Sequence, residues 1–446
     1  MFEYRIKFLA AVVFAFQAFS IALVWVGQSA QLPNIVFVMS DDQGYGDLGS
    51  YGSQDLDTPH IDRLAREGVR FTDFYANGPT CSPTRAAFLT GRYQQRLGLD
   101  NALYYQEMGR GLDIEARSLA EDLKGVGYTT GLTGKWHLGY DEGRRPLEQG
   151  FDHFFGMLGG NHHYFEHMDR IGVADLWDGE EPIEREGYTT DLITEEAVGF
   201  IHEHKDEPFF LFLAHAAPHF PYQGPGDRDK VVRPRERSWG EGDRETYIKM
   251  VEHMDAGIGK VISEIDRLGL AERTLIVFTS DNGGSTYSDN SPLSGEKSTI
   301  WEGGIRVPCI ARWLGALPEG ESFSTPCITM DWTATIRALA GVQPDDLSHP
   351  GEGIDLIPLL VGNDDPEPER TLFWRRKSGP VRKVDNPGRA ARQGKWKLLE
   401  ETDGESYLFD LDSDIAEREN LLETYPEKAE ELRRLLDAWE RDVDKR

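Results

Sequence analysis

The chain has 446 residues, of which 77 are acidic and 48 basic, so its formal net charge at pH 7 is −29. A chain this acidic, without a run of basic residues and interleaved aromatic side chains, is not expected to bind nucleic acid. Its three cysteines do not make a disulfide framework, and its length accommodates one large core and a smaller second unit.

The first 30 residues predict an export signal. Arg5 and Lys7 precede a nearly unbroken apolar run from Phe8 to Val26, and cleavage is expected near Ser29 or Ala30. The run is also close to the shortest segment that can span a bilayer, so an uncleaved membrane anchor is the alternative. In both cases the remaining chain is expected outside the cytoplasm, as a periplasmic, secreted or membrane-anchored protein.

The next part of the chain alternates between apolar strands and amphipathic helices. Four short apolar segments predict buried strands, at Asn34–Met39, Tyr128–Leu132, Pro208–Leu213 and Thr274–Phe278. Helical patterns lie between and after them, at Thr58–Glu67, Ala116–Lys124, Thr190–His204, Thr246–Leu268 and Met330–Ala340. This alternation predicts an α/β main domain over residues 31–361, with a large mixed, mostly parallel sheet flanked by helices.

A second unit is expected after a polar linker. The proline-bearing segment 362–370 marks the boundary, and residues 371–446 predict a small C-terminal subdomain. Short antiparallel strands are expected at 371–377, 394–401 and 406–412, followed by a closing helix over Tyr425–Asp442. In the main domain, Cys309 and Cys327 lie in apolar runs, where they could pair or simply pack.

Polar side chains follow each of the four predicted strands. They are Asp41, Asp42, Lys135, His137, His215, His219, Asp281 and Asn282. Each residue alone could be a helix cap or a hydrogen-bonded structural residue. Because ligands bind beyond the carboxyl ends of strands in open α/β sheets, we expect the four loops to converge on one site.

Four of these side chains suit a hard metal ion. Asp41, Asp42, Asp281 and Asn282 offer oxygen ligands, which favour Ca²⁺ or Mg²⁺ over zinc. Three carboxylates in one place need compensation, so a divalent cation is their natural partner. Zinc remains open because histidines are nearby, although the HxxxH of residues 215–219 follows a strand and is not helical.

The third cysteine precedes a predicted helix in CSPTRAAFLTG, residues 81–91. Ser82 and Pro83 are expected as its cap and first helical residue, and Gly91 as its end. Cys81 would then lie at a helix N-terminus, where backbone N–H groups favour negative charge. A small buried cysteine without a chemical role is the alternative.

Residues 81–91 read C-x-P-x-R-x-x-x-x-T-G, and here the chain resembles the sulfatase family of the alkaline phosphatase superfamily. The resemblance continues in PNIVFVMSDDQGYGDLGSYG, GKWHLG, APHFP, TSDNGG and GEKSTIWEGGIRVP, in the order that the family uses. It implies an alkaline phosphatase-like fold, hydrolysis of a sulfate ester, and oxidation of Cys81 to formylglycine by a formylglycine-generating enzyme. The hydrated aldehyde would be the nucleophile, and its second hydroxyl would later expel sulfate.

The resemblance also implies roles for individual residues. The metal ligands would be Asp41, Asp42, Asp281, Asn282 and the modified Cys81, with Ca²⁺ the usual ion and Mg²⁺ possible.

Five further side chains would bind the sulfate and move protons. Arg85 and Lys135 would hold the formylglycine and the sulfate oxygens, and His137 would assist breakdown of the enzyme-bound sulfate. His219 and Lys297 would meet the oxygen of the leaving alcohol. His215 is expected to support the site from outside it, because the family's histidine directly precedes an aromatic residue and a proline.

The substrate is less defined than the reaction. The segment 159–169 and Trp301 could line a sugar-binding cleft or could equally be packing residues. The charged segment 226–243 is expected to be a solvated loop, and the alternative is that it supplies arginine and lysine side chains to additional sulfates. The favoured function is an exported sulfatase acting on a sulfated carbohydrate or an aryl sulfate. The alternatives are a phosphatase or phosphonate monoester hydrolase of the same superfamily, and an inactive sulfatase-like protein that binds anionic glycans.

Overall fold

A computed structural model describes residues 32–104, 107–343, 351–362, 370–377 and 387–445. The expected signal and most of the expected linker, residues 363–369, lie outside these ranges. In the described part of the chain, no helix is both long enough and apolar enough to cross a membrane.

The main sheet has five parallel strands at its centre, in the order β9-β1-β8-β4-β5. They are β1 (Asn34–Ser40), β4 (Thr129–Lys135), β5 (His153–Met157), β8 (Phe209–Ala214) and β9 (Thr274–Ser280). The four predicted strands are therefore confirmed. The predicted end of β4 at Leu132 was too early, because Gly134 continues the pairing with Ala214 of β8 at a φ of 116°.

Short strands that the sequence analysis did not predict extend both edges of this sheet. Those that extend it are β2 (Val69–Phe71), β6 (Trp177–Asp178), β7 (Glu181–Pro182), β10 (Cys309–Arg312) and β11 (Glu321–Phe323), and β3 (Phe74–Tyr75) pairs separately with β12 (Cys327–Ile328). Since β10 runs antiparallel to β9, the sheet is mixed but mostly parallel, as expected. Cys309 and Cys327 are buried free thiols, so they pack and do not pair.

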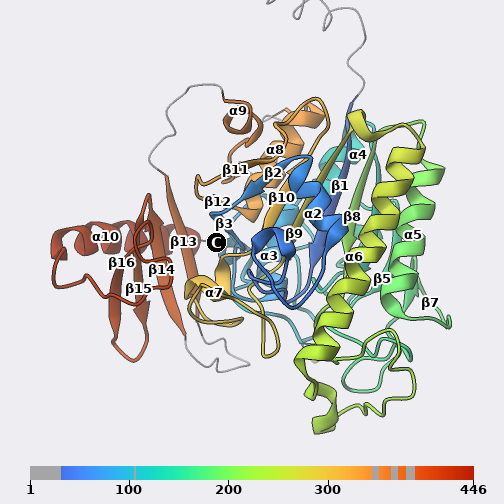
Figure 1. The fold of residues 1–446 in the computed structure, drawn as a ribbon, viewed down its shortest axis with the longest axis horizontal. Coiled ribbons are helices and arrows are strands. Elements are labelled where there is room, and N and C mark those ends of the chain that lie inside the picture. The colour runs from blue at the N-terminus through green and yellow to red at the C-terminus, as the bar shows by residue number, and fades with distance from the viewer. Residues whose placement is uncertain (1–31, 105–106, 344–350, 363–369, 378–386, 446) are drawn as a thin grey trace, which may run out of the picture.

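Helices cover both faces of the main sheet (Figure 1). One face carries α2 (Pro59–Arg66), α5 (Thr189–Glu203) and α6 (Arg244–Arg267), and the other carries α3 (Cys81–Thr90), α4 (Leu119–Gly125) and α8 (Thr329–Ala340). Alternate residues of β1 enter the two layers, because successive side chains of a strand point to opposite faces. All five predicted amphipathic helices are present, with ends shifted by a few residues.

The C-terminal residues form an antiparallel sheet beside the short helix α7 (Glu302–Ile305), on the left in Figure 1. Its strands are β13 (Thr371–Arg376), β14 (Gly388–Gln393), β15 (Trp396–Glu401) and β16 (Ser406–Asp410), and α10 (Pro426–Val443) packs on it. The three predicted strands and the closing helix are confirmed, whereas β14 was missed. Lys397 of β15 connects the C-terminal sheet to α7 through a 2.8 Å bond to Glu302, and it also bonds to Glu417 over 2.8 Å.

Candidate active site

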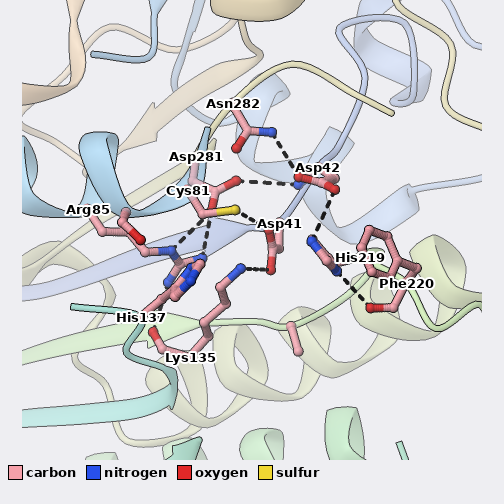
Figure 2. A network of polar contacts seen from close by, with 12 residues as sticks. Asp41, Asp42, Cys81, Arg85, Lys135, His137, His219, Phe220, Asp281 and Asn282 are labelled. Atoms are coloured by element: carbon pink, nitrogen blue, oxygen red, sulfur yellow. Dashed lines mark hydrogen bonds and ion pairs between the residues drawn. The ribbon is translucent and has the colours of Figure 1, made fainter. Parts of the chain in front are cut away.

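The carboxyl ends of four adjacent parallel strands bring the predicted residues together (Figure 2). Asp41 and Asp42 follow β1, while Asp281 and Asn282 follow β9. The other two strands contribute Lys135, the last residue of β4, and the segment after β8 that carries His219. The expectation that the four loops converge is therefore confirmed.

Cys81 is the first residue of α3, and its predicted cap was wrong. Thr80 is the N-cap residue, and the Ser82 hydroxyl accepts a 3.0 Å hydrogen bond from the backbone N–H of Leu103. Pro83 is tolerated at the third helical position because the first four N–H groups of a helix lack partners within it. The predicted end is confirmed, since Gly91 closes α3 at a φ of 71°.

The Cys81 thiol lies between an acid and a base. Its Sγ is 3.6 Å from Asp41 Oδ1 and 3.6 Å from Lys297 Nζ. One ligand atom each from Asp41, Asp42, Cys81 and His219 lie within 4.8 Å of one another, which is close enough to hold one metal ion. Cys81 therefore belongs to the same cluster as the strand-end carboxylates.

Each of the three carboxylates has a basic partner. Arg85 donates to Asp281 Oδ2 over 3.0 Å and 2.9 Å, and Lys135 forms an ion pair with Asp41. Lys297 Nζ lies 2.6 Å from Asp42 Oδ1 and 2.7 Å from Oδ2. Buried charges of one sign are unfavourable without such partners, so the bases hold the acidic cluster together.

The compensation is uneven between the two neighbouring aspartates. Burial, together with the nearby charge of Asp281, raises the pKa of Asp41 to about 7 against the opposing effect of Lys135. Burial acts on Asp42 in the same direction, but Lys297 and then His219 hold the pKa of Asp42 well below its usual range. Negative charge on Asp41 is therefore the least compensated within the cluster.

Asn282 supplies a direct test of whether the site suits a metal. Its Nδ2 donates to Asp42 Oδ1 over 2.9 Å and to the Gly283 carbonyl over 2.9 Å. Its Oδ1 is buried and has no hydrogen-bond partner among the described residues. An amide oxygen left free beside carboxylates fits a hard divalent cation, so the residues present match the expected Ca²⁺ or Mg²⁺ ligands.

The hydrogen bonds of two histidines define which ring nitrogen can exchange a proton. His219 Nδ1 lies 2.7 Å from the Phe220 carbonyl, so it carries a proton, and Nε2 faces Asp42 Oδ2 at 3.5 Å. His137 Nε2 lies 2.9 Å from the Leu103 carbonyl, which leaves Nδ1 as the acceptor. Burial and the charge of Lys135 lower the pKa of His137 well below its ordinary value, so the ring is neutral.

His215 lies outside this cluster. It is fully buried, burial lowers its pKa to about 3, and neither ring nitrogen has a hydrogen-bond partner among the described residues. Its backbone N–H donates to the Met39 carbonyl over 2.9 Å. The structure thus separates His215 from His219 by position, as the sequence analysis expected.

A cavity of about 560 Å³ opens above Cys81, a size typical of small-molecule sites. His137, His219 and Lys297 line its inner part. The outer part is formed by segments 101–104, 159–161 and 169–171, together with Phe220, Arg235 and Arg376. Four of the predicted catalytic residues, Cys81, His137, His219 and Lys297, therefore line one open site, while Arg85 and Lys135 are buried beside it.

The two interpretations of segment 159–169 each hold for part of it. Asn161 and Asp169 line the cavity, but His162 and His163 are buried and bonded to protein groups. Trp301 packs on the C-terminal sheet, against Tyr407 and Phe409, and does not line this cavity.

Sequence reasoning missed two contributions to the cavity. Segment 101–104 has no pattern that would place it beside His137, and Arg376 comes from the C-terminal sheet. The only sequence signal for Arg376 was the adjacent pair Arg375 and Arg376. Because neighbouring residues of a strand face opposite sides, these two arginines had to point in different directions.

A buried cluster of carboxylates, bases and a helix-terminal thiol below an open cavity is suited to hydrolysis of a charged oxyanion ester. The fold and the site together define an ester hydrolase of the α/β class, with a side-chain cluster that is compatible with a bound metal ion.

Comparison with known proteins gives the family. A family model described as Sulfatase matches residues 33–342. The N-acetylgalactosamine-6-sulfatase of Mus musculus is 36% identical over 374 residues, which cover 78% of this chain and 69% of that protein. The steryl-sulfatase of Rattus norvegicus is 32% identical over 430 residues, covering 76% and 72%. The chain belongs to the sulfatase family and is a sulfuric ester hydrolase.

Solved structures agree with this assignment. The crystal structure of Ps i-CgsB in complex with k-i-k-neocarrahexaose aligns with a TM-score of 0.83 at 32% identity, covering 92% of this chain and 93% of that one. The phosphonate monoester hydrolase of Agrobacterium radiobacter aligns with a TM-score of 0.69 at 19% identity, covering 92% and 96%, and shares the fold.

Proposed function

We propose that this sulfatase hydrolyses a sulfate ester of a carbohydrate and that Cys81 acts after oxidation to formylglycine. The observation that carries the proposal is the position of Cys81, at the start of α3 and 3.6 Å from both Asp41 and Lys297. The surrounding C-x-P-x-R sequence supports recognition by a separate maturation enzyme. The hydrated aldehyde supplies a nucleophilic hydroxyl where the thiol now lies.

We further propose that Asp41, Asp42, Asp281, Asn282 and the modified residue 81 hold a Ca²⁺ ion. The free Oδ1 of Asn282 and the incompletely compensated Asp41 support this set. A bound divalent cation supplies positive charge against the sulfate oxygens and the nucleophile.

Protons move at two defined atoms in this proposal. His219 Nε2 donates to the oxygen of the departing alcohol, because Nδ1 is committed to the Phe220 carbonyl. His137 Nδ1, on a neutral ring, accepts the proton that is released when the enzyme-bound sulfate breaks down. Arg85 and Lys135 orient the nucleophile and the sulfate oxygens from the floor of the site.

A carbohydrate substrate is supported by the relatives and by the cavity. One relative is named for a 6-sulfated N-acetylgalactosamine, and one solved neighbour at 32% identity holds a neocarrahexaose. The cavity of about 560 Å³ has room for more than the sulfate group. Export remains part of the proposal and rests on the apolar segment of residues 8–26.

Mass spectrometry of the tryptic peptide of residues 71–85, from protein made in a maturing host, tests the nucleophile. The peptide is expected to carry an aldehyde at residue 81 in place of the thiol. Cys81→Ser should lose nearly all turnover in a host that modifies only cysteine, while Cys309→Ser, the matched buried control, should remain active. Unmodified cysteine throughout fully active enzyme would falsify this part of the proposal.

A panel of substrates tests which class of ester the enzyme hydrolyses. Sulfated sugars and a nitrophenyl sulfate are compared with a nitrophenyl phosphate and a phosphonate monoester. Turnover of the phosphorus esters in preference to every sulfate ester would favour the alternative hydrolase function over this one.

A further inference from the structure

Two arginines at the outer part of the cavity have no use in the proposed reaction. Arg170 and Arg235 both line the cavity, and both side chains are exposed. Among the described residues, no carboxylate lies within ion-pair distance of either one. They are therefore positive charges that face the substrate space without an ion pair, and the one electrostatic interaction of Arg235 with a carboxylate is that with Asp169.

The two arginines are held together by the backbone. The N–H of Arg235 donates to the carbonyl of Arg170 over 2.8 Å, which ties two segments that are distant in sequence. Arg235 also has a φ of 63°, a left-handed conformation that is unfavourable for a residue with a side chain. The fold thus keeps a non-glycine residue in a strained conformation at the cavity, which is a frequent feature of binding sites.

Two neighbouring arginines of the same segment, unlike Arg235, form ion pairs. Arg233 lies 3.7 Å from Glu236, and Arg237 lies 3.4 Å from Glu241. In a chain with a net charge of −29, an arginine on the surface readily finds an acidic partner. Among the described residues Arg235 forms no such ion pair, and Asp169 interacts with it only beyond ion-pair distance. The charge of its guanidinium group is therefore only partly offset within the chain and is available to an anion from outside it.

The rest of the outer cavity is consistent with an anionic ligand. Arg376 of β13 lines it from the side of Lys297 and donates to the Ser298 carbonyl. One carboxylate is present among the lining residues, that of Asp169, and its Oδ1 accepts 2.9 Å hydrogen bonds from the N–H groups of Ile171 and Val173. The acid is therefore engaged by backbone, and positive charge dominates the outer cavity.

We propose that Arg170 and Arg235 form a second anion subsite, which binds an acidic group on the sugar next to the one whose sulfate reaches Cys81. This inference rests on the proposed function and extends it to substrates with at least two anionic groups. The second group is a sulfate ester or a uronate carboxylate, since the planar guanidinium group binds both in the same bidentate way. Local cations are also what a strongly acidic protein needs to attract a polyanion.

The double variant Arg170→Ala/Arg235→Ala tests the subsite in the matured full-length enzyme. Both side chains are exposed, and alanine at 235 keeps the same backbone preference, so the fold should be unaffected. We expect kcat/KM on a disulfated oligosaccharide to fall roughly 10- to 100-fold, mainly through KM, while turnover of nitrophenyl sulfate stays within about twofold. Arg233→Ala/Arg237→Ala, which removes the same two charges outside the cavity, should match the wild type on both substrates.

Comparison of three matched oligosaccharides identifies the second group. They carry two sulfates, one sulfate and one uronate, or one sulfate alone. A loss confined to the disulfated or to the uronate substrate assigns the subsite to that anion. Equal losses on the monosulfated substrate, or no loss on any of them, would overturn the proposal.

A binding measurement distinguishes failure of this inference from failure of the proposed reaction. Calorimetric titration of Cys81→Ser protein with the disulfated oligosaccharide should show about tenfold or more weaker binding when both arginines are replaced, and the difference should shrink at high salt. If the wild type turns over no sulfate ester but this difference remains, the proposed reaction fails and the subsite stands. If the affinities are equal, the subsite fails regardless of turnover.

Discussion

Replacement of His219 by alanine tests the assignment of the leaving-group acid. The ring stands in the wall of the cavity, with Nδ1 bonded to the Phe220 carbonyl and Nε2 3.5 Å from Asp42 Oδ2. Only Nε2 is therefore free to give a proton to a departing oxygen. His215, four residues earlier, lies outside the cavity and is the matched control.

The expected magnitude follows from the chemistry of the leaving group. A sugar alkoxide needs a proton as the bond to sulfur breaks, whereas a nitrophenolate hardly does. Loss of a general acid costs on the order of 10²–10⁴ in rate, or about 2.7–5.4 kcal/mol of transition-state stabilisation. We expect the lower end of this range on a sulfated sugar, because the Lys297 ammonium near Asp42 remains to stabilise the leaving oxygen.

The assay is kcat/KM for both variants across aryl sulfates of graded leaving-group pKa, with a sulfated sugar as the extreme case. His219→Ala should steepen the dependence on leaving-group pKa, with a loss of less than about tenfold on nitrophenyl sulfate. His215→Ala should show a smaller loss that is similar for all substrates. A steeper dependence for His215→Ala, with an unchanged one for His219→Ala, would reverse the assignment.

Three further predictions concern the metal and stability. Chelation should abolish activity, and Ca²⁺ should restore it better than Zn²⁺. Asp42→Ala should lower the metal content measured by elemental analysis. Full metal occupancy in that variant would remove Asp42 from the ligand set. Lys397→Met should destabilise the fold by about 3–5 kcal/mol in urea unfolding, because Glu302 and Glu417 lose their shared cation, whereas the exposed control Lys395→Met should leave the unfolding midpoint nearly unchanged. Burial raises the pKa of Glu417 from 4.5 to about 7 despite Lys397, so the folded state binds more protons and stability should fall as pH rises through this interval. Glu417→Gln should flatten that slope, and an unchanged slope would contradict the role of this group.

The residues of the reaction centre could be predicted because they follow strands. Apolar segments predicted β1, β4, β8 and β9, and the chain places Asp41, Lys135, His219 and Asp281 at or after their ends. The general rule for parallel sheets then brings these ends together without knowledge of strand order. Local patterns were sufficient because the chemistry lies next to regular structure.

The parts that were missed depend on contacts between distant segments. β10 has only four residues and β2 has three, too few for a periodic pattern. β10 pairs antiparallel with both β2 and β9, and this pairing makes the sheet mixed at that edge. β14 lacks a clear alternation and is recognised only through its partners β13 and β15. The N-terminus of α3 was misplaced by two residues because Ser82 bonds to the distant Leu103 and does not cap.

The balance of charge at the site also depends on contacts between distant segments, which the sequence does not show. The sequence shows three carboxylates that need a cation, but only the fold reveals that Arg85, Lys135 and Lys297 each already face one. A divalent cation among the carboxylates would offset them in place of Lys135 and Lys297. Lys135 would then be available to the sulfate oxygens and Lys297 to the oxygen of the leaving alcohol. The bases that stabilise the acidic cluster are thus the ones that the reaction needs. The metal ligands and the sulfate-binding residues are for this reason expected to be energetically coupled, with double variants such as Asp42→Ala/Lys297→Ala losing less than the sum of the single losses.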